Sequence, residues 1–102
     1  MAKWLEVASC NELPLDTHKT IYIEGVALIV CNIDGRFYAI EDRCSHMDFP
    51  LSDGFFEKGE VTCLHHGARF CIKTGEALCA PAFDAISTFE VRVIEDKIEV
   101  LI

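Results

Sequence analysis

Apolar and polar positions near the N-terminus follow a β-strand pattern. The stretches KTIYIE (19–24) and ALIVCNI (27–33) are rich in β-branched residues and are separated by Gly25. Asp34 and Gly35 then stand between the second stretch and RFYAIE, and an Asp-Gly pair between apolar runs is a strong signal for a two-residue hairpin turn. This part of the chain therefore predicts an antiparallel hairpin.

The C-terminal segment predicts a second hairpin. In STFEVRVI, Phe89, Val91 and Val93 alternate with charged residues, which is the period of a half-buried strand. A turn at Glu95 and Asp96 separates this run from KIEVLI. Helix signals are nearly absent from the whole chain, so the pattern indicates an all-β protein.

The middle segment, about 42–83, has a different pattern, with only brief strand-like runs such as GEVTC and RFCI. Proline and glycine interrupt it at Pro50, Gly54, Gly59, Gly67, Gly75 and Pro81. We therefore predict a single domain over 1–102. An antiparallel β-sandwich or barrel is built from 1–41 and 84–102, and a loop-rich subdomain is inserted over about 42–83.

Composition limits the classes of function. The chain has 102 residues, of which 51% are apolar, but no apolar run approaches the roughly 20 residues that span a bilayer. The beginning, MAKWLEVASC, lacks the apolar stretch of a signal peptide, so we expect a cytoplasmic protein without a membrane partner. The formal net charge of −8 repels phosphate backbones, which argues against nucleic acid and favours partners with a positive surface.

Six cysteines in a short chain raise the question of disulfides or metal. A disulfide framework needs an oxidising compartment, whereas in a reducing cytosol paired Cys and His residues more often hold a metal. Single cysteines among apolar or loop residues commonly behave as small buried hydrophobes. We interpret four of the six in this way: Cys10, Cys31, Cys71 and Cys79.

Two Cys/His pairs lie in the middle segment. Cys44 and His46 form C-x-H, and Cys63 and His66 form C-x-x-H. The short spacing within each pair lets two side chains of one loop turn toward a common point, and a hairpin can bring the two loops face to face. Such a donor set fits either a tetrahedral Cys₂His₂ zinc site or a [2Fe–2S] cluster in which two histidines replace two cysteines on one iron. Zinc sites usually show two Cys together followed by two His together.

The residues CSH (44–46) and CLHH (63–66), followed by Gly67 and Phe70, resemble the Rieske iron–sulfur motif. The stretches LSDGFFEKGEVTCLHHGARF and TGEALCAPAFDAISTFEVRVIEDKIEV look like the corresponding parts of soluble Rieske-type ferredoxins from bacterial aromatic ring-hydroxylating dioxygenase systems. The similarity extends over nearly the whole chain and includes KWLEVAS at the beginning.

The resemblance implies one [2Fe–2S] cluster. Cys44 and Cys63 would hold the buried iron, and His46 and His66 would hold the outer iron and face solvent. His65 competes with His66 because Cys63-x-His65 copies the spacing of the first loop, but the family pattern selects His66. His65 is then expected to be a solvated neighbour.

Departures from the family pattern carry their own expectations. High-potential Rieske proteins have an extra cysteine in each loop, joined in a disulfide, where this chain has Phe49 and His65. They also place serine and tyrosine hydroxyls near the cluster, where this chain has Ala68 and Phe70. Without those hydroxyls the reduced form loses stabilisation, so the potential should lie toward the lower end of the Rieske range of about −150 to +300 mV. Met47 stands where the soluble ferredoxins usually have glycine.

Three other residues carry smaller expectations. Gly67 should permit a close backbone approach after His66. Pro81 lies where the family has a proline-bearing loop over the cluster, with an ordinary turn as the alternative. His18, in the polar stretch LDTHK, is interpreted as a surface residue.

The chain has no room for a second domain with a mononuclear iron, and the acid pairs Glu41-Asp42 and Glu95-Asp96 look like solvated turn residues. The predicted protein is thus not an enzyme but a one-electron carrier. It would accept electrons from an NAD(P)H-dependent flavoprotein reductase and deliver them to a terminal Rieske oxygenase. The acidic surface would speed brief encounters with basic patches on these partners. Two alternatives stay open: a small Rieske-like subunit of a nitrite reductase, and a structural Cys₂His₂ zinc module.

Overall fold

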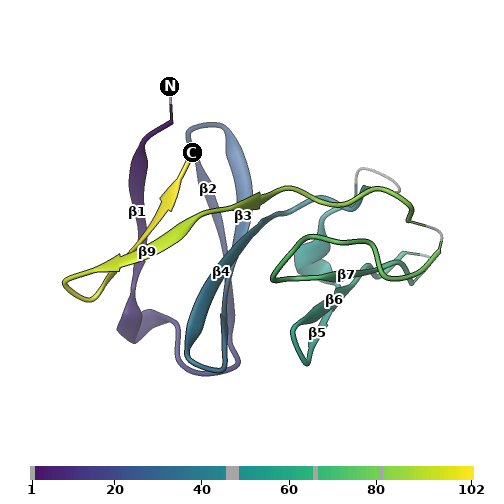
Figure 1. The fold of residues 1–102 in the computed structure, drawn as a ribbon, viewed down its shortest axis with the longest axis horizontal. Helices are drawn as coiled ribbons and strands as arrows, with labels where there is room; N and C mark the ends of the chain where they lie inside the picture. Colours follow the sequence, from purple (N-terminus) through teal and green to yellow (C-terminus); the bar gives the residue numbers. More distant parts are fainter. Residues whose placement is uncertain (1, 46–48, 66, 81) are drawn as a thin grey trace.

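A computed structural model describes residues 2–45, 49–65, 67–80 and 82–102. Its strands form three antiparallel sheets, and its only helical elements within these ranges are two short 3-10 turns (Figure 1). The all-β prediction is confirmed. No helix among the described residues has the length and apolar character needed to cross a membrane.

Two sheets make up the basal part, on the left of Figure 1. The first has the order β1-β10-β9 and consists of β1 (Trp4–Ser9), β10 (Lys97–Leu101) and β9 (Val91–Ile94). The second has the order β2-β3-β4-β8 and consists of β2 (His18–Ile23), β3 (Val26–Ile33), β4 (Arg36–Glu41) and β8 (Thr88–Phe89). The chain ends lie side by side, since the Lys3 N–H donates to the Ile102 carbonyl at 2.8 Å.

The third sheet belongs to the segment between β4 and β8, on the right of Figure 1. A 3-10 turn, η2 (Leu51–Asp53), precedes its three short strands: β5 (Phe55–Glu57), β6 (Glu60–Thr62) and β7 (Arg69–Cys71). All strands of the two basal sheets lie within 4–41 and 88–101, and all strands of the third lie within 55–71. The subdomain boundaries predicted at 41/42 and 83/84 stay a prediction.

Both predicted hairpins are present. Asp34 and Gly35 have φ of 55° and 87° between β3 and β4, and Glu95 and Asp96 have φ of 49° and 65° between β9 and β10. Positive φ at both central residues is the geometry of a two-residue turn that matches the twist of the flanking strands.

The stretch STFEVRVI is not one strand. It divides at Glu90: Phe89 in β8 pairs with Ala39 in the second sheet, and Val91 in β9 pairs with Val100 in the first sheet. The predicted alternation fails after this switch, because Val93 is 46% exposed. The chain crosses from one basal sheet to the other here, and a period-two pattern carries no information on such a crossing.

Strand β3 explains how the inserted part is attached. Leu28 and Val30 point into the basal core with Ile98, whereas Ile29 and Cys31 belong to a second buried cluster shared with the insertion. Alternate residues of this strand are thus buried on both faces, which is why its sequence reads as a continuous apolar run.

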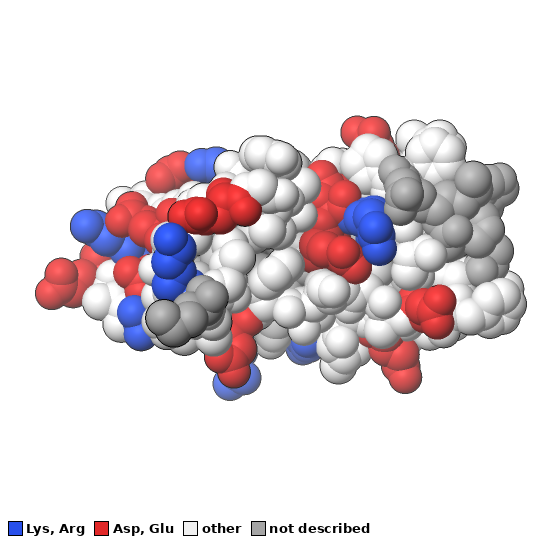
Figure 2. Space-filling model, turned by 90° about the horizontal axis from the view of Figure 1, so that it is seen from above, with Lys and Arg blue, Asp and Glu red and all other residues white. Residues whose placement is uncertain are grey.

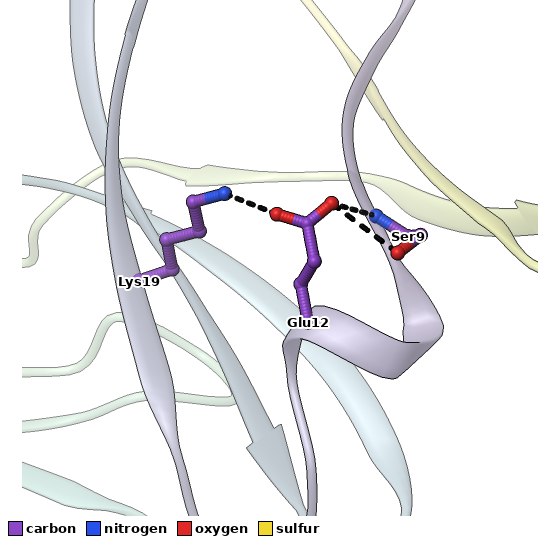
Figure 3. Close-up of polar contacts among 3 residues, drawn as sticks. All are labelled: Ser9, Glu12 and Lys19. Carbon is purple, nitrogen blue, oxygen red and sulfur yellow. Dashed lines mark hydrogen bonds and ion pairs between the residues drawn. The ribbon is translucent and has the colours of Figure 1, made fainter.

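A polar contact joins the two basal sheets near the 3-10 turn η1 (Cys10–Glu12), which leads from β1 toward β2 (Figure 3). One carboxylate oxygen of Glu12 accepts hydrogen bonds from the Ser9 N–H at 3.1 Å and the Ser9 Oγ at 3.2 Å. The other accepts from Lys19 Nζ at 2.6 Å, and this contact lowers the pKa of Glu12. The end of β1 is thereby tied to β2.

Candidate metal centre

Two loops of the insertion carry the predicted ligand pairs, and both are closed by the same kind of hydrogen bond. In the first loop the Cys44 N–H donates to the Phe49 carbonyl at 2.9 Å. In the second loop the Cys63 N–H donates to the Ala68 carbonyl at 2.7 Å. Each cysteine therefore begins a loop that returns to it five residues later (49 − 44 = 5 and 68 − 63 = 5). The hairpin of β6 and β7 positions the second loop directly.

The two cysteine side chains meet at the base of these loops. Cys44 and Cys63 are each 1% exposed and unbridged, and their thiols lie close enough to interact. Burial raises the pKa of the Cys63 thiol, and the neighbouring Cys44 raises it further, while a hydrogen bond from the backbone N–H of His65 acts in the opposite direction. Two adjacent buried sulfurs are a donor pair that can bind a soft metal as thiolates.

The acids before the first loop are structural residues, so their assignment as solvated turn residues is wrong. The Asp42 carboxylate accepts hydrogen bonds from the Ser52 N–H at 2.8 Å and the Ser52 Oγ at 2.9 Å. Glu41 Oε1 accepts from the Ser87 N–H at 2.8 Å. Asp42 thus ties the entry of the first loop to η2. The other acid pair, in the β9–β10 turn, is exposed as expected.

A third segment, after β7, contacts both loops. Ser45 Oγ donates to the Asp84 carbonyl at 2.6 Å, and Cys79 Sγ donates to the Gly67 carbonyl at 3.6 Å. The proline expected over the cluster, Pro81, lies outside the described residues. The contacts on either side of it nevertheless tie this segment to the loops that hold Cys44 and Cys63.

His65 is not a solvated neighbour. It is half-buried, and its ring stacks on Phe49 with a centroid separation of 3.7 Å and an interplanar angle of 21°. From the sequence, both residues were interpreted as positions that lack the extra cysteines of high-potential relatives, and His65 also as a solvated competitor of His66. The stack was missed because aromatic pairing between two separate loops leaves no periodic signal in the sequence.

The structure brings together two of the four predicted ligands. Cys44 and Cys63 are in contact, whereas His46 and His66 lie outside the described residues, as does Met47. Within the described ranges, no group of three or more metal-ligating side chains converges. Within these ranges, the buried thiol pair is the part of the site that fits a soft metal.

The hydroxyl-free positions lie close to this pair in the fold. Ala68 and Phe70 are both 0% exposed and belong to the same buried cluster as Cys44 and Cys63. Because these surroundings are apolar, a charged thiolate there is stabilised mainly by backbone hydrogen bonds or by a bound metal.

The structure adds detail to the expectations for Gly67 and His18. Gly67 has φ of 73°, and no atom of the described residues lies within 4 Å of the place where a Cβ would stand. The glycine thus serves a left-handed backbone conformation, and the expected close approach of its backbone stays a prediction. His18 is on the surface as expected, but its ring stacks on Phe56 at 3.8 Å and 20°, and this partial burial lowers its pKa.

The remaining cysteines agree only in part with the prediction of buried hydrophobes. Cys31 is 3% exposed, and burial raises its pKa to about 12, so it is a structural core residue. Cys10, Cys71 and Cys79 are half-buried. Cys79 also interacts with the Arg69 guanidinium, and this contact raises the pKa of Arg69.

Known proteins are similar to this chain in sequence and in fold. The biphenyl 2,3-dioxygenase ferredoxin component of Rhodococcus jostii is 42% identical over 71 residues, which cover 70% of this chain and 66% of that protein. The 3-phenylpropionate/cinnamic acid dioxygenase ferredoxin subunit of Photorhabdus laumondii subsp. laumondii is 39% identical over 100 residues, which cover 96% and 93%. The aligned part thus spans slightly less than two thirds of the first relative and nearly all of the second.

A solved structure with the same fold is a chain in the complex of reduced oxygenase and oxidized ferredoxin in carbazole 1,9a-dioxygenase. Its TM-score is 0.89 at 31% identity, with 95% of this chain and 91% of that chain covered. The family model of the Rieske [2Fe-2S] domain matches residues 3–90. Since that match covers most of the chain and includes both loops and the buried thiol pair, this chain belongs to the Rieske [2Fe-2S] domain family.

Proposed function

We propose that this chain is the ferredoxin component of an aromatic ring-hydroxylating dioxygenase system, a one-electron carrier with one Rieske [2Fe–2S] cluster. The observation that carries the proposal is the buried, unbridged pair of Cys44 and Cys63, which two identically closed loops present in a chain that matches the Rieske family. The relatives described above are named as ferredoxin components of such systems. Chemistry on the aromatic ring would belong to the oxygenase and not to this chain.

The proposed ligands are Cys44 and Cys63 for one iron and His46 and His66 for the other. The cluster would supply a centre that takes up and releases a single electron. The chain's own residues bury the two sulfurs and hold the loops closed, and the backbone N–H of His65 lies beside the sulfur of Cys63. The stacking of the His65 ring on Phe49 supports His66, and not His65, as the second imidazole ligand.

The proposed partners are a flavoprotein ferredoxin reductase as electron donor and a terminal Rieske oxygenase as acceptor. The similar carbazole dioxygenase chain comes from a complex of oxygenase and ferredoxin, which supports the acceptor. Near the loops, Leu64 is 52% exposed and Phe83 is 86% exposed. Apolar side chains this exposed are candidates for contact with a partner at the end where His46 and His66 would pass the electron.

We also propose that the protein works in the cytoplasm. None of its six cysteines is in a disulfide, including the two whose thiols are in contact. Such a pair would be at risk of oxidation to a disulfide in an oxidising compartment before a cluster could be inserted.

Metal analysis and spectroscopy of the purified protein test the proposal. We expect a red-brown protein with about two irons and two sulfides per chain and the electron paramagnetic resonance signal of a reduced Rieske centre. Cys44→Ser and Cys63→Ser should remove the chromophore, while the matched variant Cys71→Ser, at a half-buried cysteine outside the site, should keep it. A colourless protein with one zinc per chain would instead support the structural zinc module.

A further inference from the structure

Two rings from the two loops of the site lie face to face. Phe49 is the residue at which the first loop closes, and His65 lies within the second loop. Their centroids are 3.7 Å apart and their planes are inclined by 21°. Both side chains are half-buried, and Phe49 packs against the buried cluster that contains Cys44 and Cys63. The stack is thus a direct side-chain contact between the loops, anchored on one side to the core.

Each stacked residue also contacts one cysteine of the site through its backbone. The Phe49 carbonyl accepts the N–H of Cys44 at 2.9 Å, and the His65 N–H lies beside the sulfur of Cys63. Pairing of the two rings therefore holds in place the Phe49 carbonyl, which contacts Cys44, and the His65 N–H, which contacts Cys63.

Unlike the contact between the two thiols, the stack does not depend on whether a metal is bound. The thiols of Cys44 and Cys63 interact with each other, and binding of iron as thiolates would replace that contact. The rings of Phe49 and His65 need no such change, so they can hold the loops in the same relation before and after a cluster binds.

We propose that the stack of Phe49 and His65 is a brace that holds the two cluster loops together, with His65 as a positioning residue and not a ligand. The inference rests on the proposed ligand set Cys44, His46, Cys63 and His66. Its physical consequence is kinetic: a cluster leaves when the loops part, and the brace makes that parting less frequent.

The molecule contains a matched control for this contact. His18 in β2 and Phe56 in β5 form a second stack of the same two ring types, with centroids 3.8 Å apart and planes inclined by 20°. Neither residue belongs to the cluster loops. His18→Ala therefore removes a stack of nearly the same geometry without changing the contact between the loops.

The test is the rate at which the cluster chromophore bleaches in excess iron chelator. It compares the wild type with His65→Ala, His65→Phe, Phe49→Leu, the double variant F49L/H65A and the control His18→Ala. Phe49→Leu keeps apolar volume in the core but loses the ring. His65→Ala and Phe49→Leu should bleach about 2- to 10-fold faster than the wild type, which is the rate equivalent of one aromatic pair. His65→Phe, which keeps a ring without nitrogen, and His18→Ala should stay close to the wild type.

Two further readouts separate a brace from general destabilisation. The double variant should bleach no faster than the faster of its two single variants, because both remove the same contact. The electron paramagnetic resonance signal of His65→Ala should match that of the wild type, because the ligands are unchanged. Wild-type bleaching rates in His65→Ala, or equal acceleration in His65→Phe and His65→Ala, would overturn the brace.

The brace and the proposed function fail in different ways. A wild-type protein that binds no cluster would overturn the proposed function itself. If the wild type binds a cluster but neither His65→Ala nor His65→Phe does, His65 is a ligand and the brace is wrong while the electron-carrier function stands.

Discussion

Ala68 and Phe70 are fully buried in the apolar cluster that also contains the two cysteines, and neither side chain can donate a hydrogen bond to sulfur. Sulfur in the reduced cluster carries more negative charge than in the oxidised one, so a hydrogen bond to it favours reduction. The lack of donors at these two positions therefore favours a low potential.

Adding a hydroxyl at either position should raise the midpoint potential. We expect a rise of roughly 20 to 65 mV for each of Ala68→Ser and Phe70→Tyr. A hydrogen bond contributes about 0.5–1.5 kcal/mol, and for one electron a tenfold change in the equilibrium constant corresponds to about 59 mV. Spectroelectrochemical titration measures the shift, with Phe56→Tyr as a control outside the site. A wild-type midpoint above roughly +100 mV would contradict the low-potential argument.

His18 should make the protein less stable in mild acid. Burial against Phe56 lowers its pKa in the folded protein, whereas the pKa of the unfolded residue is about 6.5. As the pH falls through that value, the unfolded chain binds a proton more readily than the folded one, so stability present above about pH 6.5 is lost. In His18→Phe the free energy of unfolding should therefore fall less between pH 7.5 and 5 than in the wild type, as measured by urea titration. An equal or larger fall in the variant would refute this.

Among the elements, the junction of η2 and β5 depends on one glycine. A Cβ on Gly54 would clash with the backbone carbonyl of Thr62, the last residue of β6 and the neighbour of Cys63. The φ of Gly54 is −89°, which other residues can adopt, so the close approach and not the backbone conformation requires glycine here.

Gly54→Ala should consequently displace β6 and the second loop. We expect a loss of about 1–3 kcal/mol in the free energy of unfolding, typical of overpacking, together with a lower iron content per chain. The control is Gly25→Ala, in the turn between β2 and β3, where φ is 76° and no described atom is near. It should lower stability through backbone strain but leave iron content unchanged. Normal stability and full iron content in Gly54→Ala would show that the contact is easily relieved.

Short-range patterns predicted some elements and missed others. The Asp34-Gly35 turn and the strands around it were predictable, because turn chemistry and a run of β-branched residues act within a few positions. The break at Glu90 and the short strand β5 were not predicted. The break at Glu90 depends on which distant strands lie alongside, and that information is absent from a local pattern. Strand β5 pairs with its neighbour β6, but its three residues are too short a run to show a period.

Across the whole molecule, acidic residues outnumber basic ones by 17 to 9. On the face seen in Figure 2, acidic side chains lie over both the basal end and the end with the cluster loops. Asp84 is an exposed acid beside the first loop, where its carbonyl accepts the hydroxyl of Ser45. Glu95, in the exposed β9–β10 turn, lies on the basal part away from the loops (Figure 1).

Electron transfer to the terminal oxygenase should slow as salt rises. Between about 0.01 and 0.15 M ionic strength we expect a decrease of roughly tenfold, because screening weakens the attraction between an acidic carrier and basic patches on its partner. Stopped-flow mixing of the reduced protein with oxidised oxygenase measures the rate. Asp84→Asn should reduce both the low-salt rate and its salt dependence, whereas Glu95→Gln should change neither. A rate that does not depend on salt would count against electrostatic docking.

The sequence by itself determined the hairpin turns, the all-β class and the two Cys/His pairs that carry the likeness to the Rieske family, because each depends on residues a few positions apart. Only the tertiary structure decided which side chains from separate segments meet. It brings Cys44 against Cys63 and Phe49 against His65, and it turns Asp42 from a supposed surface acid into an anchor of η2. Such contacts arise because β3 buries both of its faces, so that the inserted segment folds back onto the basal sheets and its loops close over a shared core.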